Sequence, residues 1–153
     1  MKKNGSVVLE IYPMETQTAY LDANFYVALQ IIKHPFHNTS IKILKKYPNL
    51  IVCYSILTLD EIIFSLTKYN FDKNIIYQNI YENLFDNPRM FNLPLNSNKD
   101  FLESYLQTWS EHNLKPRDAM HYFFMQQNNI TKIATFDTDF IKNKKRLGIE
   151  ILK

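Results

Sequence analysis

Near its amino terminus the chain reads Ala19-Tyr20-Leu21-Asp22-Ala23-Asn24-Phe25-Tyr26-Val27-Ala28-Leu29, an apolar run that one carboxylate interrupts. Residues 19–21 suit a short strand, and the apolar residues after Asp22 recur at helical spacing, at Phe25, Ala28, Leu29 and Ile32. Asp22 therefore lies at the carboxyl end of a predicted strand. In open α/β sheets ligands bind at that edge, because strand ends and helix amino termini meet there. Asp is also a good helix N-cap, which is a purely structural alternative for Asp22.

Length and composition predict one globular domain. The chain has 153 residues, of which 46% are hydrophobic, enough for one core of ordinary size. We expect this domain to span residues 1–153, with residues 1–18 as an amino-terminal extension in which residues 7–12 have the pattern of an extra strand. No apolar run is long enough to cross a bilayer, and Glu10 interrupts the segment behind the basic amino terminus. We therefore expect no membrane association and a cytoplasmic location.

Charge, cysteine and glycine usage exclude several classes of protein. The net charge of +3 is too small to indicate a nucleic-acid binder by itself. The single cysteine, Cys53, excludes an intrachain disulfide, and its apolar neighbours predict a buried strand residue. The two glycines, Gly5 and Gly148, are too few for a P-loop or a glycine-rich dinucleotide turn.

Apolar periodicity predicts strands that alternate with helices along the rest of the chain. The further strands are expected at residues 50–55, 89–95, 131–136 and 148–152. The helices are expected from residue 23 to near His34, at 38–46, from Thr58, at 72–85, after a capping box at 97–100, from Pro116 to about Asn128, and as a short helix within 137–143. This alternation is typical of an α/β protein whose mostly parallel sheet is covered by helices on both faces.

Carboxylates occupy strand ends or first helical turns at four places, namely at Asp22, at Glu61, at Asp118, and at the pair Asp137 and Asp139. Each has a structural alternative. Thr58-Leu59-Asp60-Glu61 has the form of a capping box, and the helical wheel sets Glu61 opposite the apolar stripe of its helix. Asp118 suits the helix dipole, and Asp137 suits an N-cap.

The set of acids favours function more than any single member does. In a parallel sheet these positions lie at one edge, so the carboxylates would converge. Two unit charges about 4 Å apart repel by about 4 kcal/mol at an effective dielectric near 20, and a divalent cation removes that repulsion. Oxygen ligands without a cysteine or a zinc-spaced histidine pair suit Mg²⁺ or Mn²⁺, which commonly act on phosphate esters.

Four segments carry these acids: Tyr20-Leu21-Asp22-Ala23-Asn24, Ser55-Ile56-Leu57-Thr58-Leu59-Asp60-Glu61-Ile62, Lys115-Pro116-Arg117-Asp118-Ala119-Met120-His121 and Ala134-Thr135-Phe136-Asp137-Thr138-Asp139-Phe140. In order and spacing they resemble the motifs of the PIN-domain ribonucleases, and within that family the small toxins of VapBC-type toxin–antitoxin pairs. The resemblance aligns the acid of the second motif with Glu61 and not with Asp60. It implies a three-layer α/β/α sandwich with a mostly parallel central sheet.

The resemblance also implies an activity, that of a divalent-metal-dependent endonuclease that hydrolyses RNA phosphodiester bonds as a VapC-type toxin. The implied catalytic acids, which would also bind Mg²⁺ or Mn²⁺, are Asp22, Glu61, Asp118 and Asp137, with Asp139 as a further candidate metal ligand. The implied supporting residues are Asn24 and Thr135. Candidates to contact RNA are Arg117 and Lys68, which lies two turns after Glu61 on its helix, with a solvated surface lysine as the structural alternative for Lys68. His121, three residues after Asp118, could face the same cleft, but it is expected to be a structural histidine. The expected partners are RNA, a small antitoxin and a second copy of the chain. Residues 74–91 are the candidate protein-binding surface, with a plain core helix as the structural alternative.

Alternatives come from other classes of protein. A haloacid-dehalogenase-type phosphatase also uses a strand-end Asp, but its chemistry requires a second Asp where this chain has Asn24. A PIN-like RNA-binding or structural module would keep the fold without turnover, whereas all four acidic positions are filled here. A housekeeping RNA-processing nuclease would share the chemistry without being a toxin.

Overall fold

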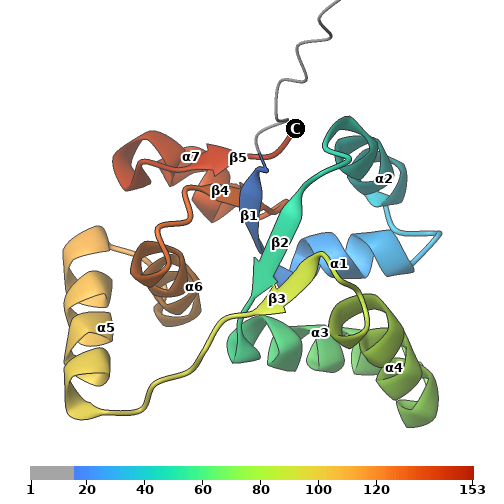
Figure 1. Cartoon of the computed structure of the whole chain (residues 1–153), viewed down its shortest axis with the longest axis horizontal. Coiled ribbons are helices and arrows are strands. Elements are labelled where there is room, and N and C mark those ends of the chain that lie inside the picture. The colour runs from blue at the N-terminus through green and yellow to red at the C-terminus, as the bar shows by residue number, and fades with distance from the viewer. Residues whose placement is uncertain (1–15) are drawn as a thin grey trace, which may run out of the picture.

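The computed structural model describes residues 16–153, which form a single parallel sheet surrounded by helices (Figure 1). Within these residues five strands pair in the order β3-β2-β1-β4-β5, and every pair is parallel. The strands are β1 (Thr18–Leu21), β2 (Ile51–Tyr54), β3 (Met90–Asn92), β4 (Lys132–Ala134) and β5 (Glu150–Ile151). The strand predicted at residues 7–12 lies outside the described part of the chain.

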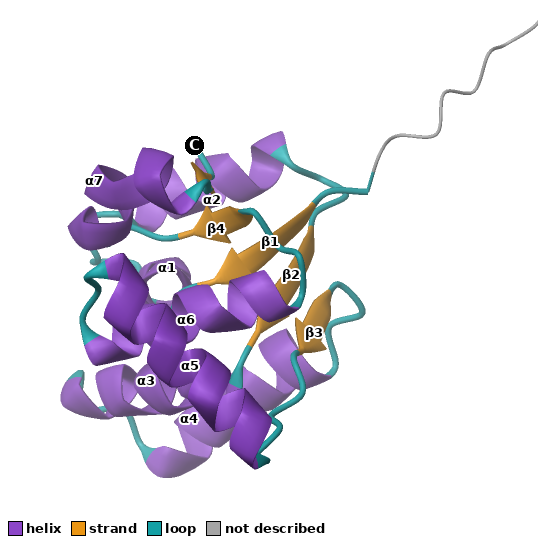
Figure 2. Ribbon diagram, turned by 90° about the vertical axis from the view of Figure 1, so that its left-hand side faces the viewer, coloured by secondary structure: helices purple, strands orange, loops and turns teal. Residues whose placement is uncertain are grey.

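Helices cover both faces of the sheet, so the predicted three-layer α/β/α sandwich is confirmed. One layer comprises α1 (Ala23–Gln30), α2 (His37–Lys46), α3 (Ile56–Lys68), α4 (Lys73–Ile80) and the π-helical turn η1 (Tyr81–Phe85). The other comprises α5 (Lys99–His112), α6 (Pro116–Gln127) and α7 (Thr138–Leu147). Figure 2, seen from the side of this second layer, shows α5 and α6 in front of the strands. No helix within residues 16–153 combines the length and the apolar character needed to cross a membrane.

Strand side chains alternate between the two helical layers, as the period of a strand requires. In β1, Ala19 and Leu21 pack with the layer of α1 to α4, whereas Tyr20 packs with the layer of α5 to α7. Tyr20 is in register with Cys53 of β2 on one side and Ile133 of β4 on the other. Cys53 is buried, as predicted. The central position of β1 explains why its sequence is apolar on both faces.

Helix α3 begins earlier than predicted and is capped differently. Its N-cap is Ser55, whose hydroxyl accepts a hydrogen bond from the Thr58 N–H at 3.3 Å, while Thr58 Oγ1 accepts one from the Ser55 N–H at 3.4 Å. The capping box is therefore Ser55 with Thr58, and the predicted box of Thr58 with Glu61 is wrong. The carboxylate of Glu61 has no capping role at this helix start.

The buried face of α3 also differs from the predicted stripe. It carries Thr58, Ile62 and Leu66, whereas Ile63 is 43% exposed. Residues three apart on a helix are neighbours, so Glu61 lies beside Thr58 at the border of the buried face. The prediction that Glu61 points away from the core is therefore wrong.

Other boundaries shift by a few residues. Helix α1 ends at Gln30 rather than near His34, and the helix predicted at residues 72–85 ends in the π-helical turn η1. The N-cap of α5 is Asn98, whose Oδ1 accepts a hydrogen bond from the Phe101 N–H at 2.9 Å, so the capping box predicted at residues 97–100 is wrong.

Helix α7 is longer than the short helix predicted within residues 137–143. Only Phe140 and Leu147 are buried in this helix, so a stripe of two apolar side chains was too sparse to mark its length. Its last turn carries Lys144, Lys145 and Arg146. Their positive charges interact favourably with the negative end of the helix dipole. Gly148 ends the helix in the left-handed conformation, with φ of 65°.

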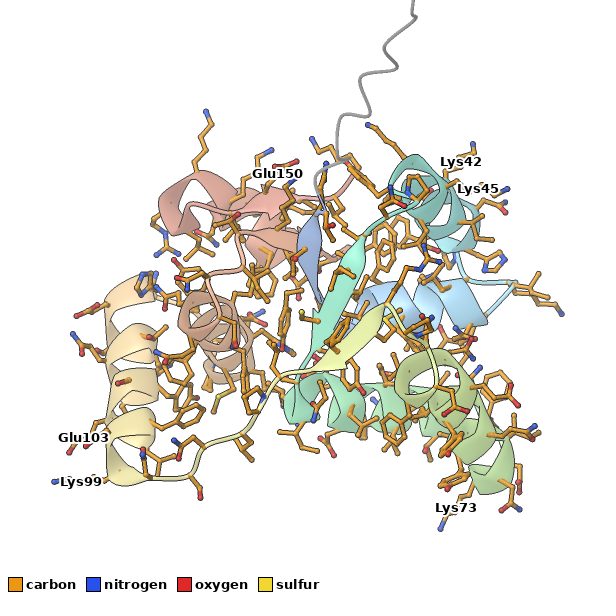
Figure 3. The ribbon with its side chains drawn as sticks, in the orientation of Figure 1. Lys42, Lys45, Lys73, Lys99, Glu103 and Glu150 are labelled. Carbon is orange, nitrogen blue, oxygen red and sulfur yellow. The ribbon has the colours of Figure 1, made fainter. Side chains whose placement is uncertain are left out.

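Charged side chains are spread over the outer surface of the helices. Figure 3 shows Lys42 and Lys45 projecting from α2, and Lys99 and Glu103 projecting from α5. Lys99 and Glu103 form an exposed pair at 3.4 Å, an arrangement worth little to stability in water.

We predict that Gly148→Ala lowers the free energy of unfolding by about 1–2 kcal/mol, because a side chain disfavours the left-handed conformation. A Cβ at this position would meet no atom within 4 Å, so the cost comes from the backbone alone. Urea denaturation measures the change. The matched control is Asn113→Gly, at a residue with φ of 46°, which should not lower stability. Equal stability of Gly148→Ala and the parent would mean that α7 does not end in this way.

Candidate active site

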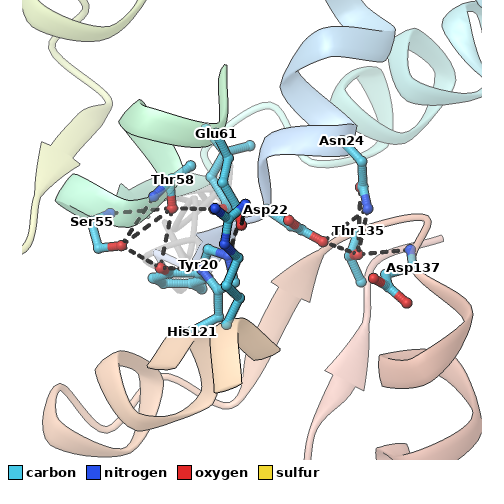
Figure 4. Close-up of polar contacts among 11 residues, drawn as sticks. Tyr20, Asp22, Asn24, Ser55, Thr58, Glu61, His121, Thr135 and Asp137 are labelled. Atoms are coloured by element: carbon cyan, nitrogen blue, oxygen red, sulfur yellow. Dashed lines mark hydrogen bonds and ion pairs between the residues drawn. The ribbon is translucent and has the colours of Figure 1, made fainter. Parts of the chain in front are cut away.

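A pocket of about 380 Å³ lies where β1 and β4 end, at the carboxyl edge of the sheet. Its lining includes four of the predicted acids, Asp22, Glu61, Asp118 and Asp137, together with Asn24, Arg117 and His121. These residues come from all four motifs, and they lie far apart in the sequence. Figure 4 shows Asp22, Asn24, Glu61, His121 and Asp137 of this set with their polar contacts.

Asp22 follows β1 directly and is buried. It occupies the N-cap position of α1, but its side chain makes no capping hydrogen bond there. Its Oδ2 accepts hydrogen bonds from Thr135 Oγ1 at 2.5 Å and from Asn24 Nδ2 at 2.9 Å. Burial is the main cause that raises the pKa of the Asp22 carboxyl. The side chain is thus aimed at the pocket by its neighbours and does not serve the helix.

Asn24 and Thr135 link the first and fourth motifs. Asn24 Oδ1 accepts a hydrogen bond from the Phe136 N–H at 3.0 Å, and Thr135 Oγ1 accepts one from the Asp137 N–H at 2.9 Å. Both side chains therefore hold Asp22 and the turn after β4 together.

Glu61 meets two basic side chains from α6. Its Oε2 lies 2.9 Å from Nε2 of the buried His121, and its Oε1 lies 3.6 Å from the guanidinium of the largely exposed Arg117. Residue Glu61 of α3 is thus held against α6 at the pocket.

A buried hydroxyl lies behind this contact. Tyr20 Oη is 2.8 Å from His121 Nδ1, 2.6 Å from Ser55 Oγ and 3.1 Å from Thr58 Oγ1. Thr58 Oγ1 in turn donates to the Leu21 carbonyl at 3.0 Å. This network joins β1, the start of α3 and α6 (Figure 4).

Asp118 stands in the first turn of α6, two residues after Pro116 at the helix start. Its pKa is raised to about 6, mainly by burial and then by the negative charges of Asp137 and Asp139. The part of the shift that comes from Asp137 and Asp139 reflects repulsion between carboxylates, which a cation between them would remove.

The structure distinguishes the two acids of the fourth motif. Asp137 is the N-cap of α7, accepts a hydrogen bond from the Asp139 N–H at 2.7 Å, and lines the pocket. Asp139 is not among the described residues that line the pocket. Its Oδ2 forms an ion pair with Lys115 Nζ at 2.6 Å. The hydrogen bond from Lys115 holds the pKa of Asp139 below its usual value.

The two residues predicted to contact RNA differ in position. Arg117 lines the pocket, whereas Lys68 is outside the described lining. The Lys68 ammonium lies 4.4 Å from the ring centre of Phe64, which does line the pocket.

Sequence reasoning did not include Tyr20 and His121 among the site residues. His121 was predicted to be structural, and its hydrogen bonds on both ring nitrogens agree with that, yet one of its partners is a site acid. The available signal was the spacing of three residues from Asp118, which places His121 on the same face of α6.

The residues at the pocket suit a divalent cation. Asp22, Glu61 and His121 each offer one ligand atom, and these atoms all lie within 4.8 Å of one another. Buried carboxylates with a raised pKa gain from a nearby positive charge, and oxygen donors are the ligands that Mg²⁺ and Mn²⁺ take in proteins.

The protein is thus a parallel α/β/α sandwich with an acidic pocket at the carboxyl edge of its sheet. The four sequence motifs predicted a protein of this class. The family model for the PIN domain matches residues 19–146. The chain therefore belongs to the PIN domain family, and the predicted resemblance is confirmed.

Three solved structures are similar to this chain. VapC20 of Mycobacterium tuberculosis, described as a sarcin-ricin loop cleaving toxin, is 19% identical, with 81% of this chain and 93% of that chain covered and a TM-score of 0.62. FitAB bound to an IR36 DNA fragment is 14% identical, with 88% and 93% covered and a TM-score of 0.63. FitAcB of Neisseria gonorrhoeae is 14% identical, with 88% and 96% covered and a TM-score of 0.62. At these identities the likeness shows the fold. No curated protein sequence matches the chain.

We predict that Asp118→Asn stabilises the metal-free protein at pH 7. The folded-state pKa of about 6 lies above the ordinary value of 3.8, so stability is lost as the pH rises through this window. After allowance for solvent screening at this half-exposed carboxyl, the gain should be about 1 kcal/mol. Thermal unfolding in EDTA at pH 4 and pH 7 measures it.

The control for this measurement is Asp60→Asn, at the exposed neighbour of Glu61, which should leave the pH profile unchanged. If Asp118→Asn melted at or below the parent temperature at pH 7, the acids would not repel one another as the geometry indicates.

Proposed function

We propose that the chain is a divalent-metal-dependent ribonuclease, an endonuclease that hydrolyses RNA phosphodiester bonds and acts as a VapC-type toxin. The observation that carries the proposal is the convergence of Asp22, Glu61, Asp118 and Asp137 on one pocket in a member of the PIN domain family. The similarity of its fold to VapC20, a toxin that cleaves the sarcin-ricin loop, supports the same assignment.

In this proposal the four pocket acids hold Mg²⁺ or Mn²⁺. When bound, such a cation supplies charge neutralisation at a non-bridging phosphate oxygen and lowers the pKa of an attacking water. Asn24 and Thr135 orient Asp22 by holding its Oδ2, which leaves Oδ1 outside these two hydrogen bonds. Asp139, which Lys115 already neutralises, is the weaker candidate for a metal ligand.

Arg117 and Lys68 are proposed to bind the RNA backbone. Arg117 is 65% exposed at the pocket, so its guanidinium can exchange the Glu61 carboxylate at 3.6 Å for an RNA phosphate. Lys68 lies on the same helix as Glu61, two turns further on. In this proposal its ammonium contacts an RNA strand that leaves the pocket in that direction.

The rival functions fit the pocket less well. Asn24 donates to Asp22 and accepts from the Phe136 N–H, so it holds the site where a dehalogenase-type phosphatase would need an acid. A module without turnover has no need for buried carboxylates with a raised pKa, which cost stability. A housekeeping RNA-processing nuclease would have the same pocket and is separated from a toxin by its effect on cells.

We predict that Asp22→Asn, Glu61→Gln and Asp118→Asn each reduce RNA cleavage by about 100-fold or more, because each removes a charge that would hold the cation. Labelled RNA is incubated with each protein in EDTA, Mg²⁺ or Mn²⁺, and p-nitrophenyl phosphate is offered in parallel as a phosphatase substrate. Circular dichroism establishes that each variant is folded.

The control for cleavage is again Asp60→Asn, which alters an adjacent carboxylate that lies outside the described lining of the pocket. Full activity of Glu61→Gln would remove the second motif from the site. Turnover of p-nitrophenyl phosphate without RNA cleavage would favour a phosphatase.

We also propose a protein-binding surface on α4, η1 and β3, within the predicted segment of residues 74–91. Its exposed apolar side chains are Ile75, Tyr77, Tyr81, Phe85 and Phe91. Beside them a groove of about 340 Å³ runs between α3 and α4. An apolar surface of this kind suits a small antitoxin or the second copy of a homodimer, in the cytoplasm where the RNA substrate would be.

We predict that expression of the chain from an inducible promoter arrests growth and that Asp22→Asn relieves the arrest, because the arrest would require RNA cleavage. Colony counts and growth curves measure the effect, with immunoblots to establish equal protein levels. Normal growth with a soluble, RNA-cleaving parent would contradict the toxin role and favour a housekeeping nuclease.

A further inference from the structure

His121 faces the proposed cation position from α6, one turn after Asp118. Its side chain is 2% exposed, and its Nε2 is 2.9 Å from Glu61 Oε2. The donor atoms of Asp22, Glu61 and His121 lie within 4.8 Å of one another. An ion about 2.1 Å from each donor requires donors no more than about 4.2 Å apart, so small side-chain movements would close the set.

We propose that His121 is a metal ligand through Nε2 and that its imidazole makes the centre select Mn²⁺ over Mg²⁺. The inference rests on the proposed function, because it concerns the same pocket. Imidazole nitrogen binds first-row transition metal ions in preference to Mg²⁺, whereas carboxylates serve Mg²⁺ and Mn²⁺ alike. A buried nitrogen among oxygen donors therefore raises the affinity for Mn²⁺ relative to that for Mg²⁺.

The surroundings of Nδ1 suit a histidine ligand. Histidines that bind metals almost always use the other ring nitrogen as a hydrogen-bond donor, which fixes the ring. Here Nδ1 lies 2.8 Å from Tyr20 Oη, a buried hydroxyl able to accept that bond. Tyr20 Oη can then donate to Thr58 Oγ1 at 3.1 Å or to Ser55 Oγ at 2.6 Å.

The hydroxyl network accommodates both states of the ring without loss of hydrogen bonds. Without an ion, Nε2–H donates to Glu61, Tyr20 Oη donates to Nδ1, and Ser55 Oγ donates to Tyr20 Oη. With an ion on Nε2, the Nε2 proton passes to solvent and one proton from solvent returns at Nδ1. Nδ1–H then donates to Tyr20 Oη, Tyr20 Oη donates to Ser55 Oγ, and Ser55 Oγ donates to Thr58 Oγ1 at 3.4 Å. Each hydroxyl donates once in either state, so no buried donor is left without an acceptor.

The structural alternative is that His121 only donates to Glu61 and holds that carboxylate in place. In that case the ring nitrogen stays outside the coordination sphere, and the ion meets oxygen alone. The two roles differ in a property that is independent of RNA cleavage, namely whether a histidine nitrogen is bonded to the ion.

Pulsed electron paramagnetic resonance of Mn²⁺ in the full chain tests this difference. We expect the modulation of a directly bonded nitrogen, and we expect it to change from ¹⁴N to ¹⁵N character when the histidines are ¹⁵N-labelled. The signal should disappear in His121→Asn and persist in His34→Gln, since His34 is the other histidine of the described lining. Calorimetry should show that His121→Asn lowers the ratio of Mn²⁺ to Mg²⁺ affinity by about tenfold or more.

Mn²⁺ that binds the parent without histidine nitrogen coupling would overturn the inference, and the parent measurement decides this even if His121→Asn fails to fold. Absence of Mn²⁺ binding would overturn this inference, and absence of both Mn²⁺ and Mg²⁺ binding would overturn the proposed function as well. Nitrogen coupling in a protein that cleaves no RNA would support the ligand while contradicting the ribonuclease.

Discussion

The hydroxyl of Tyr20, which has no exposed surface, bonds to side chains from the start of α3 and from α6. Because β1 is the central strand, these bonds fix Glu61 and His121 relative to Asp22, which comes two residues after Tyr20. A buried hydroxyl without partners costs about 1–3 kcal/mol, so the hydrogen bonds favour this one arrangement of strand and helices. The geometry of the pocket is thus set by the protein before any ligand arrives.

The same arrangement creates an electrostatic cost. Parallel strands bring Asp22 and Asp137 to one edge, and the helices that follow bring Glu61 and Asp118 to the same place. The chain offsets part of this charge with Arg117 and Lys115, both largely exposed and on either side of Pro116. Exposed pairs of this kind are weak, so a ligand or substrate can displace them at little cost.

The order of strands and helices and the four acids could be predicted, because apolar periodicity locates strand ends and the acids follow them directly. The start of α3 could not be predicted, because Ser55 and Thr58 are both suitable N-cap residues. The choice between them depends on where β2 ends. The error over the face of Glu61 arose because the buried stripe includes the polar Thr58 and leaves Ile63 43% exposed, which apolar periodicity alone does not show. His121 is joined to Tyr20 across 101 residues, a contact that no local pattern contains. The length of α7 was missed because its surface is almost wholly polar.

Cys53 lies in β2 between β1 and β3, where it is buried and its pKa is raised by that burial. It is the only thiol in the chain. Its side chain packs in the same core cluster as residues of α6 and α7, so a thiol-reactive reagent reaches it when that helical layer opens away from the sheet. Labelling rates under native conditions would report how often the layer that covers Tyr20 opens, without an added probe.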